Sequence, residues 1–335
     1  MLLAGTGLAR ARRKSKGLIP TTPRFVELAQ TASRARSYID ASRSPATLRA
    51  YRSDWSHFQA WCGEHNVVAL PAEPAVVAMY LTDLADSGDF KASTLSRRLV
   101  SIAQAHKAAG HKSPTSDETV RLVNAGIRRT IGTAQRAVRP TVTEDIRAMV
   151  ATCGEDPAGV RDRALLLIGF AAALRRSELA DLNVDDIEQT RDGLVVTLRR
   201  SKMDQEGAGR RVGVPYGSRT STCPVRAFGA WVEAAGLEEG PLFRPVDRHG
   251  NIADARITDR GVALVVKRRA KLAGMDPAEV SGHSLRAGLA TAAAAAGVPE
   301  RVIAQTTGHK SMTVLRRYIR EGSLFNENAA AAVGL

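Results

Sequence analysis

The sequence lacks the patterns that mark several common classes of protein. Its three cysteines, Cys62, Cys153 and Cys223, lie far apart and form no CxxC pair, so neither a disulfide framework nor a zinc site is indicated. No apolar run approaches the roughly 20 residues of a membrane-spanning helix, and residues 1–4 are too short an opening for a secretory signal. A nucleotide-binding loop and a carboxylate cluster with metal-ligand spacing are also missing. We therefore expect a cytoplasmic protein that uses no membrane, no metal and no other cofactor.

Acidic residues are too few to balance the basic ones. Lysine and arginine number 48 against 34 aspartates and glutamates, which gives a formal net charge of +14. Such a charge implies a polyanionic partner, and nucleic acid is favoured over a membrane surface. The sequence therefore predicts a protein that binds nucleic acid.

The first part of the chain is predicted to be a flexible arm followed by a helical domain. A length of 335 residues exceeds one ordinary core, so two domains are expected. Residues 1–38 contain a basic run without hydrophobic periodicity, which is typical of a flexible arm. Residues 39–132 carry apolar residues at intervals of three and four, which predicts a compact helical domain. Its helices are expected to begin near Ser44, Pro74, Ser93 and the capping-box pattern of Thr115 with Glu118.

Arginines lie on the helical faces opposite these apolar stripes. Charged residues at such positions are often no more than a solvated surface. In a chain this basic, contact with phosphates is the favoured interpretation. The candidate contact residues are Arg49, Arg52, Arg97, Arg98, Arg128 and Arg129.

A linker is expected between the two domains. Residues 133–142 form a basic stretch without periodicity in which Pro140 follows several basic residues, a composition typical of linkers. The second domain is predicted over 143–322, beginning with a short helix capped by Thr143. A strongly apolar helix is expected over 160–174.

The rest of the second domain combines a strand pair with further helices. Strands are predicted at 194–198 and 211–215, joined by a long hairpin that contains Lys202. Helices are expected at 223–236, 258–273, 284–297, 299–306 and 312–320. The predicted fold class is therefore mainly α, with a helical domain followed by a mixed α/β domain that is mostly helical and holds a small antiparallel sheet.

The stretch from 283 to 318 gathers residues suited to attack on a phosphodiester. It contains His283, Arg286, His309 and Tyr318. A tyrosine phenol supplies a nucleophile, a guanidinium neutralises phosphate charge, and imidazoles move protons or donate hydrogen bonds. Any one of them alone would more often be a packing or surface residue. Their order and spacing favour a site that works without a metal ion.

Five short motifs resemble those of the tyrosine recombinases, the Cre-like and lambda-integrase-like site-specific recombinases of the phage integrase family. They are Leu174-Arg175-Arg176-Ser177-Glu178-Leu179, the hairpin residue Lys202, His283-Ser284-Leu285-Arg286, Gly308-His309, and Tyr318 at the family's nucleophile spacing. The resemblance covers the second domain fully and the first more loosely. The sequence departs from the family pattern at 171–173, which are alanines where Thr-Gly is usual, and at Thr307, which replaces a common Leu.

The resemblance implies how the phosphate is attacked. Arg175 and Arg286 would hold its nonbridging oxygens, because a guanidinium stays charged and can bond two oxygens at once. His309 would donate to the same oxygens. Tyr318 would be the nucleophile, and its reference pKa of about 10 calls for a base, for which His283 is the candidate.

The remaining motif residues have supporting roles in this interpretation. Lys202 would protonate the departing 5′ oxygen. Glu178, three residues after Arg175 on the same helical face, would hold the guanidinium or a histidine in place, and a simple helix ion pair is the alternative. Arg176 is interpreted as a contact to the DNA backbone.

The resemblance also implies the reaction and the partners. The protein is expected to be a site-specific DNA recombinase that passes through a 3′-phosphotyrosine and a Holliday junction, as a homotetramer on two double-stranded DNA sites in the bacterial nucleoid. The alternatives are a type IB topoisomerase-like enzyme that relaxes DNA and a catalytically silent DNA-binding relict. The apolar face within 323–335 predicts a tail helix that docks either on its own domain or on a neighbouring protomer.

Overall fold

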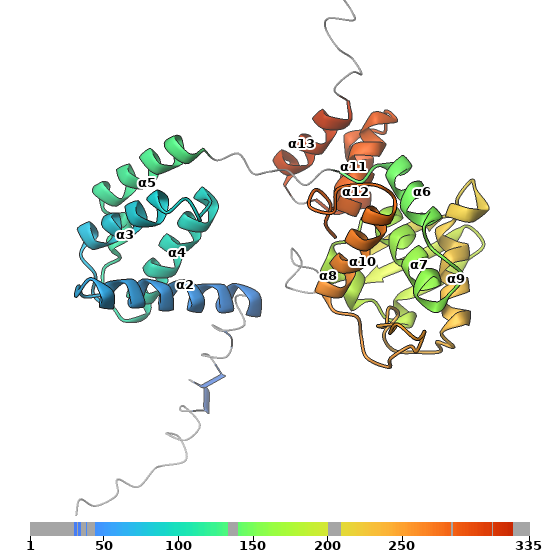
Figure 1. Ribbon diagram of the computed structural model, residues 1–335, viewed down its shortest axis with the longest axis horizontal. Coiled ribbons are helices and arrows are strands. Elements are labelled where there is room, and N and C mark those ends of the chain that lie inside the picture. Colours follow the sequence, from blue (N-terminus) through green and yellow to red (C-terminus); the bar gives the residue numbers. More distant parts are fainter. Residues whose placement is uncertain are drawn as a thin grey trace, which may run out of the picture. The chain divides into compact units, whose positions relative to one another are not determined.

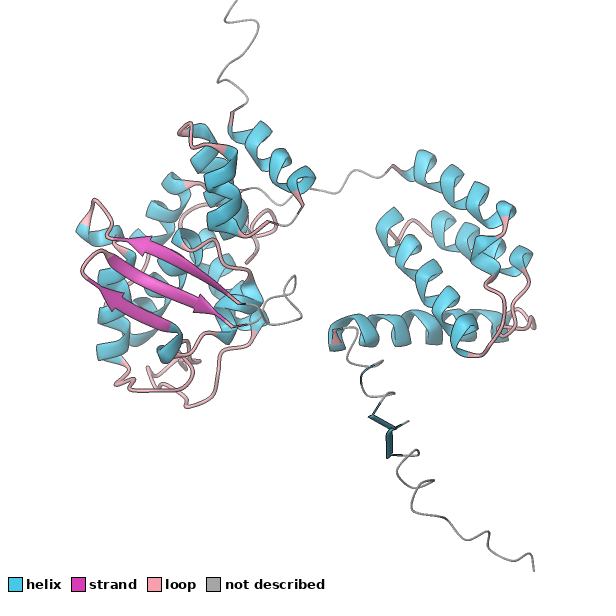
Figure 2. Ribbon diagram, turned by 180° about the vertical axis from the view of Figure 1, so that it is seen from behind, coloured by secondary structure: helices cyan, strands magenta, loops and turns pink. Residues whose placement is uncertain are grey.

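The computed structural model describes residues 30, 31, 33, 34, 38, 44–132, 140–199, 209–282, 284–309 and 311–323. The chain divides into two compact units, Met1–Gln135 and Arg136–Leu335, each with its own hydrophobic core (Figure 1). Both are built mainly from helices, and the second also holds a small antiparallel sheet (Figure 2). The expected fold class is therefore confirmed. Nearly all of the predicted arm and tail, and most of the predicted linker, lie outside the described residues, so their boundaries stay predictions.

In its described part, the first unit packs four helices around one apolar core. They are α2 (Pro45–Glu64), α3 (Pro74–Asp86), α4 (Ala92–Ala108) and α5 (Glu118–Ile131). Helix α3 packs against α5, and α2 packs against α4. Phe58, Tyr80 and Leu95 are fully buried in this core because apolar residues recur at the helical period.

The helix starts of the first unit agree with the sequence at two of four places. The Ser44 hydroxyl accepts a hydrogen bond from the Thr47 amide at 3.2 Å, and α3 begins at Pro74 as expected. The third helix begins at Ala92, one residue before the predicted Ser93. The capping-box expectation at Thr115 is wrong, because a 3-10 turn occupies Pro114–Ser116. The carboxylate of Asp117 caps α5 instead and accepts from the Thr119 amide at 2.9 Å.

The second unit follows the predicted order of elements with two additions. Its helices are α6 (Thr143–Ala151), α7 (Pro157–Ala171), α8 (Arg176–Asp181), α9 (Pro224–Ala234), α10 (Asp259–Leu272), α11 (Ser284–Ala295), α12 (Glu300–Thr307) and α13 (Met312–Gly322). Its sheet has the order β1 (Ile187–Thr190), β2 (Gly193–Leu198) and β3 (Arg210–Pro215), all antiparallel. The sequence interpretation had not included β1 or the short helix α8 as separate elements.

Two helix starts in this unit also differ from expectation. Thr143 is the first residue of α6 rather than its cap, and the carboxylate of Asp145 reaches back to accept from the Val142 amide at 3.1 Å. Helix α7 begins before residue 160, because Asp156 caps it through the Gly159 amide at 3.0 Å.

The three alanines before the arginine motif form the break between α7 and α8. Ala173 is fully buried and has a φ of 51°, in the left-handed region that glycine enters without steric cost. It stands where the family pattern usually has glycine. The turn therefore keeps the required backbone conformation with an alanine, at a cost of about 1 kcal/mol.

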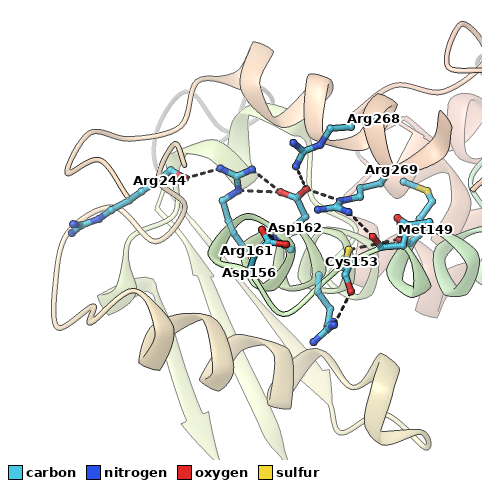
Figure 3. A network of polar contacts seen from close by, with 11 residues as sticks. Met149, Cys153, Asp156, Arg161, Asp162, Arg244, Arg268 and Arg269 are labelled. Atoms are coloured by element: carbon cyan, nitrogen blue, oxygen red, sulfur yellow. Dashed lines mark hydrogen bonds and ion pairs between the residues drawn. The ribbon is translucent and has the colours of Figure 1, made fainter. Parts of the chain in front are cut away.

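A buried carboxylate ties three helices of the second unit together (Figure 3). Asp162 on α7 is fully buried and accepts from Arg161 Nη2 and from Arg269 Nε, each at 2.7 Å. Arg268 donates to the same oxygen as Arg269, Oδ2, so α10 is bound to α7. Arg269 also donates to the Thr152 carbonyl at the end of α6, at 2.6 Å. Because the carboxylate is matched by several guanidinium donors, its charge is accommodated in the core.

Candidate active site

Arg175 and Glu178 form an ion pair at the start of α8, with Glu178 buried and Arg175 partly buried. The Arg175 amide donates to Glu178 Oε2 at 2.8 Å, and Arg175 Nη1 donates to Glu178 Oε1. Glu178 is almost fully buried in the first turn of α8. The helix macrodipole favours a carboxylate at this N-terminal end. Helix capping and the ion pair thus act together, and they fix the direction of the Arg175 guanidinium.

Arg286 lies on α11, and its guanidinium interacts electrostatically with Arg175 and Glu178. Only 1% of the residue is exposed, and Nη1 donates to the carbonyl of the left-handed Ala173 at 2.9 Å. Nη2 is buried and has no hydrogen-bond partner within the described ranges. Burial, followed by repulsion from Arg175, lowers the pKa of Arg286 to about 10. The site therefore holds a desolvated cation with one donor that the described residues leave unused.

Tyr318 lies on α13, which packs against α11. The residue is partly buried against a small apolar cluster that includes Ala290 and Leu315. Burial is the largest effect on its phenol and raises the pKa of Tyr318, while the positive charges of Arg317 and Arg286 act in the opposite direction. The phenol is therefore protonated at neutral pH and needs a base or added positive charge before it can attack.

His309 follows a left-handed glycine at the end of α12. Gly308 has a φ of +63°, and an added Cβ would lie 2.6 Å from Arg210 Nη1. The His309 ring centroid lies 6.0 Å from that of Tyr318. Its Nδ1 lies 2.7 Å from the hydroxyl of Thr307. The glycine is therefore needed both for the turn and for the close approach of an arginine.

That arginine, Arg210, is a site residue that the sequence interpretation missed. It is the first residue of β3, and its Nη1 donates to the Thr306 carbonyl at 2.8 Å. Its Nη2 lies 3.9 Å from Glu178 Oε2, which is an ion-pair distance but too long for a hydrogen bond. Burial is the main cause that lowers the pKa of Arg210, with Arg175 acting in the same direction.

A signal for Arg210 was present in the strand pattern. Val212 and Val214 alternate with exposed residues, so Arg210 shares the inward face of β3 with them. A charged residue on an inward strand position is rarely buried without a partner. Continuing this alternation from Val212 back to Arg210 places Arg210 on the inward face of β3, where its charge marks it as a candidate site residue.

The structure thus brings together most of the predicted catalytic residues. Arg175, Glu178 and Arg286 interact electrostatically with one another, and Tyr318 interacts with Arg286. His309 lies beside Tyr318. The two other predicted residues, Lys202 and His283, lie outside the described residues. Their roles stay predictions.

The predicted DNA-contact arginines fall into three groups, of which the first two are exposed and the third is Arg98 alone. Arg49, Arg52, Arg128 and Arg129 are exposed, as the interpretation requires. Arg97 and Arg176 are also exposed but are paired, Arg97 with Asp54 at 2.7 Å and Arg176 with Asp259 at 2.9 Å.

The placement of Arg98 on a solvated face is wrong. Only 7% of Arg98 is exposed, and Nη1 donates to the Tyr80 hydroxyl. Its guanidinium also lies 4.5 Å from the centre of the Phe90 ring. These partners, with Asp54 3.9 Å away, bury the cation inside the first unit.

The described ranges contain neither a membrane-spanning helix nor a candidate metal site. No helix there is long and apolar enough to cross a membrane. No three His, Cys, Asp or Glu side chains there gather in a way that could hold a metal ion.

The chain matches one protein family along most of its length. The phage integrase family matches residues 141–323, and the phage integrase N-terminal SAM-like domain matches residues 37–112. The integrase/recombinase xerD homolog of Selenomonas ruminantium is 39% identical over 300 residues, which cover 88% of this chain and 87% of that protein. Recombinase cre of Escherichia phage P1 is 26% identical over 281 residues, which cover 78% of this chain and 80% of that protein.

A solved structure shows the same fold. A lambda integrase dimer bound to a COC′ core site matches with a TM-score of 0.57 at 14% identity, covering 93% of this chain and 83% of that one. Together with the family matches and the geometry of Arg175, Arg286, His309 and Tyr318, these similarities identify the protein. The chain belongs to the phage integrase family and is a tyrosine recombinase, an enzyme that cleaves and rejoins DNA by transesterification.

Proposed function

We propose that this site binds the scissile phosphate of a DNA recombination site between Arg175 and Arg286 and attacks it with Tyr318. The observation that carries the proposal is the buried Nη2 of Arg286, which has no hydrogen-bond partner among the described residues and lies beside Arg175 and within electrostatic reach of Tyr318. A buried donor without a partner costs free energy unless a ligand supplies the acceptor. A nonbridging phosphate oxygen is such an acceptor.

The charge balance of the site supports the same ligand. Arg175, Arg210 and Arg286 interact with one carboxylate, Glu178, so the described site carries excess positive charge. Burial is the main cause that lowers the pKa of Arg286 and Arg210, and repulsion from Arg175 acts in the same direction on both. An anion would relieve this repulsion, and an anion that gains charge in the transition state would be bound more tightly at that point.

The chemical step needs no external energy source. The Tyr318 oxygen forms a bond to phosphorus as the bond to the 5′ oxygen breaks, which leaves a 3′-phosphotyrosine. In the proposed roles, His283 accepts the phenol proton and Lys202 donates a proton to the departing 5′ oxygen. A 5′ hydroxyl from a partner strand reverses the step, so one phosphodiester is exchanged for another.

The assembly and its location are part of the proposal. Four protomers would act on two DNA sites in the nucleoid and exchange strands through a Holliday junction. Arg49, Arg52, Arg128, Arg129 and Arg176 would contact the DNA backbone, together with the arm at 1–38. The tail at 323–335 would link neighbouring protomers, with docking on its own domain as the alternative. The solved lambda integrase complex is a dimer on DNA, which supports multimeric action in this fold.

One assay distinguishes the recombinase from its alternatives. Duplexes retained by the protein from a randomised pool are cloned in pairs into a supercoiled plasmid, and the protein is added in EDTA without nucleotide. We expect recombinant products that depend on the selected duplex. Relaxation without sequence preference would instead indicate a topoisomerase, and retarded bands alone would indicate a silent DNA-binding protein. Strict dependence on Mg²⁺ would contradict the metal-free mechanism.

Arg210 is expected to matter for catalysis although no motif marks it. Changing Arg210→Gln should slow single-turnover DNA cleavage about 10- to 100-fold, because a hydrogen bond from a charged group contributes about 1.5–3 kcal/mol. The neighbouring Arg211 is the control, since it is exposed and pairs with Glu188 at 3.2 Å. Arg211→Gln should change the rate by less than about threefold. Equal losses in the two variants would show that only net charge matters.

A further inference from the structure

The turn that carries His309 is held by two successive threonines and Arg210. Thr306 and Thr307 close helix α12, and each hydroxyl donates to the carbonyl four residues earlier: Thr306 to Val302 at 3.0 Å, and Thr307 to Ile303 at 2.7 Å. The two threonines differ in their surroundings. Thr307 is fully buried and its oxygen also lies 2.7 Å from Nδ1 of His309.

The number of protons available determines which atom donates in each of these contacts. Two electronegative atoms 2.7 Å apart need a proton between them, and the hydroxyl of Thr307 has only one. Since the contact between two oxygens, Thr307 Oγ1 and the Ile303 carbonyl, requires that proton, the contact to His309 must take its proton from the ring. Nδ1 of His309 is therefore the donor, and Thr307 Oγ1 is the acceptor.

A histidine with its proton fixed on Nδ1 presents Nε2 to its other neighbours. Nδ1 is engaged with Thr307, so Nε2 is the nitrogen that acts on the substrate. Arg210 also anchors this turn, because its Nη1 donates to the Thr306 carbonyl and its guanidinium lies close to Gly308. A leucine at position 307, which is common in the family pattern, offers no acceptor to Nδ1.

We propose that Thr307 is a positioning residue that sets the tautomer and the orientation of His309 and thereby directs Nε2 to the phosphate. This inference rests on the proposed function and on the role that the family resemblance implies for His309, a donor to a nonbridging oxygen. Because Nδ1 keeps its proton for Thr307, Nε2 donates to that oxygen when the ring is doubly protonated and is an acceptor when the ring is neutral. Thr307 does not touch the substrate itself. Its effect on the reaction passes through the imidazole, as with other residues that orient a catalytic histidine.

The first test measures the tautomer directly in the full-length protein without DNA. Nitrogen chemical shifts of ¹⁵N-histidine-labelled protein are recorded at a pH where the ring is neutral, and His309→Gln identifies the signal among the seven histidines. We expect the Nδ1–H form in the wild type and a mixture of the two forms in Thr307→Val, which keeps the shape but removes the hydroxyl. A wild-type ring mainly in the Nε2–H form would overturn the inference.

The second test measures single-turnover cleavage of the duplex selected with wild-type protein. Thr307→Val should slow cleavage about 10-fold or more without weakening DNA binding, and Thr307→Ser should restore most of the rate, because partners that orient a histidine typically contribute about 10- to 100-fold. Thr306→Val is the matched control. It removes an equivalent hydroxyl-to-carbonyl bond and keeps the Thr306 carbonyl that accepts from Arg210, so its rate should stay near that of the wild type.

The outcomes separate the inference from the proposed function. If the wild type forms no covalent adduct, the proposed function fails while the tautomer measurement still stands. If it forms the adduct and Thr307→Val cleaves at the same rate, the inference alone fails. Thermal melts of both valine variants show whether a loss reflects folding, and the serine variant with the nitrogen shifts decides the question if Thr307→Val unfolds.

Discussion

Replacing Tyr318 with phenylalanine is expected to abolish the covalent protein–DNA adduct and to leave DNA affinity nearly unchanged. The substitution removes one oxygen, the proposed nucleophile, and keeps the ring that packs beside His309 and against the cluster containing Leu315. The adduct is measured as a protease-sensitive band on a denaturing gel after incubation with the selected duplex.

The control is the same substitution at Tyr216. That residue belongs to the same unit, is 44% exposed and lies directly after β3. Tyr216→Phe should form the adduct at the wild-type rate. A protease-sensitive adduct that persisted in Tyr318→Phe would mean that another residue is the nucleophile.

Replacing Arg175 or Arg286 with alanine should each lower cleavage by at least about 100-fold, the usual loss when a donor to a developing oxyanion is removed. Both guanidinium groups are positioned before substrate binds: Glu178 holds Arg175, and the Ala173 carbonyl holds Arg286. Single-turnover cleavage of the selected duplex measures the loss. Arg191→Ala, at an exposed arginine paired with Asp192, is the control. Mild effects at both site arginines would contradict their proposed roles.

Activity and thermal stability should respond differently when Arg286 is replaced by methionine. Burial lowers the pKa of Arg286 to about 10, below its ordinary value of 12.5, so the charged form is less favourable in the folded than in the unfolded chain. At neutral pH, below both values, this charge therefore costs folding free energy. Arg286→Met, which keeps much of the volume, is expected to lose activity without a corresponding fall in Tm. This separation is typical of residues kept for function.

Features set by local sequence were predicted well. The cap at Ser44 and the start at Pro74 depend on residues within one turn of the helix, and the structure contains both. The pairing of β2 with β3 was predicted from an apolar run at 194–198 and an alternating run at 211–215, joined by a hairpin. Strand β1 was missed because its four residues include a single buried side chain, Ile187, which is too short a pattern to detect.

Features set by distant partners were not predicted. Arg98 has the sequence context of an exposed helix residue, and its burial depends on Tyr80 and Phe90 from elsewhere in the first unit. The same holds for Asp162, whose arginine partners on α10 are far away in the chain. Helical periodicity identifies faces but does not say which polar groups meet across them.

In the candidate site, too, residues in short motifs were predicted and residues that depend on distant partners were not. The motifs identified Arg175, Glu178, Arg286, His309 and Tyr318, because each carries a recognisable spacing. Arg210 belongs to no motif and reaches the site from a strand. The bond between Thr307 and His309 arises where the chain departs from the family pattern, so the resemblance could not reveal it.

The central claim is that Tyr318 becomes joined to DNA, and locating the joined residue tests it most directly. Wild-type protein is trapped on a nicked copy of the selected duplex, digested with protease and nuclease, and sequenced by mass spectrometry. The chain has five tyrosines, so the position is unambiguous. We predict a nucleotide attached through a 3′ phosphate to Tyr318. A nucleotide on any other residue, or attached through a 5′ phosphate, would contradict the mechanism.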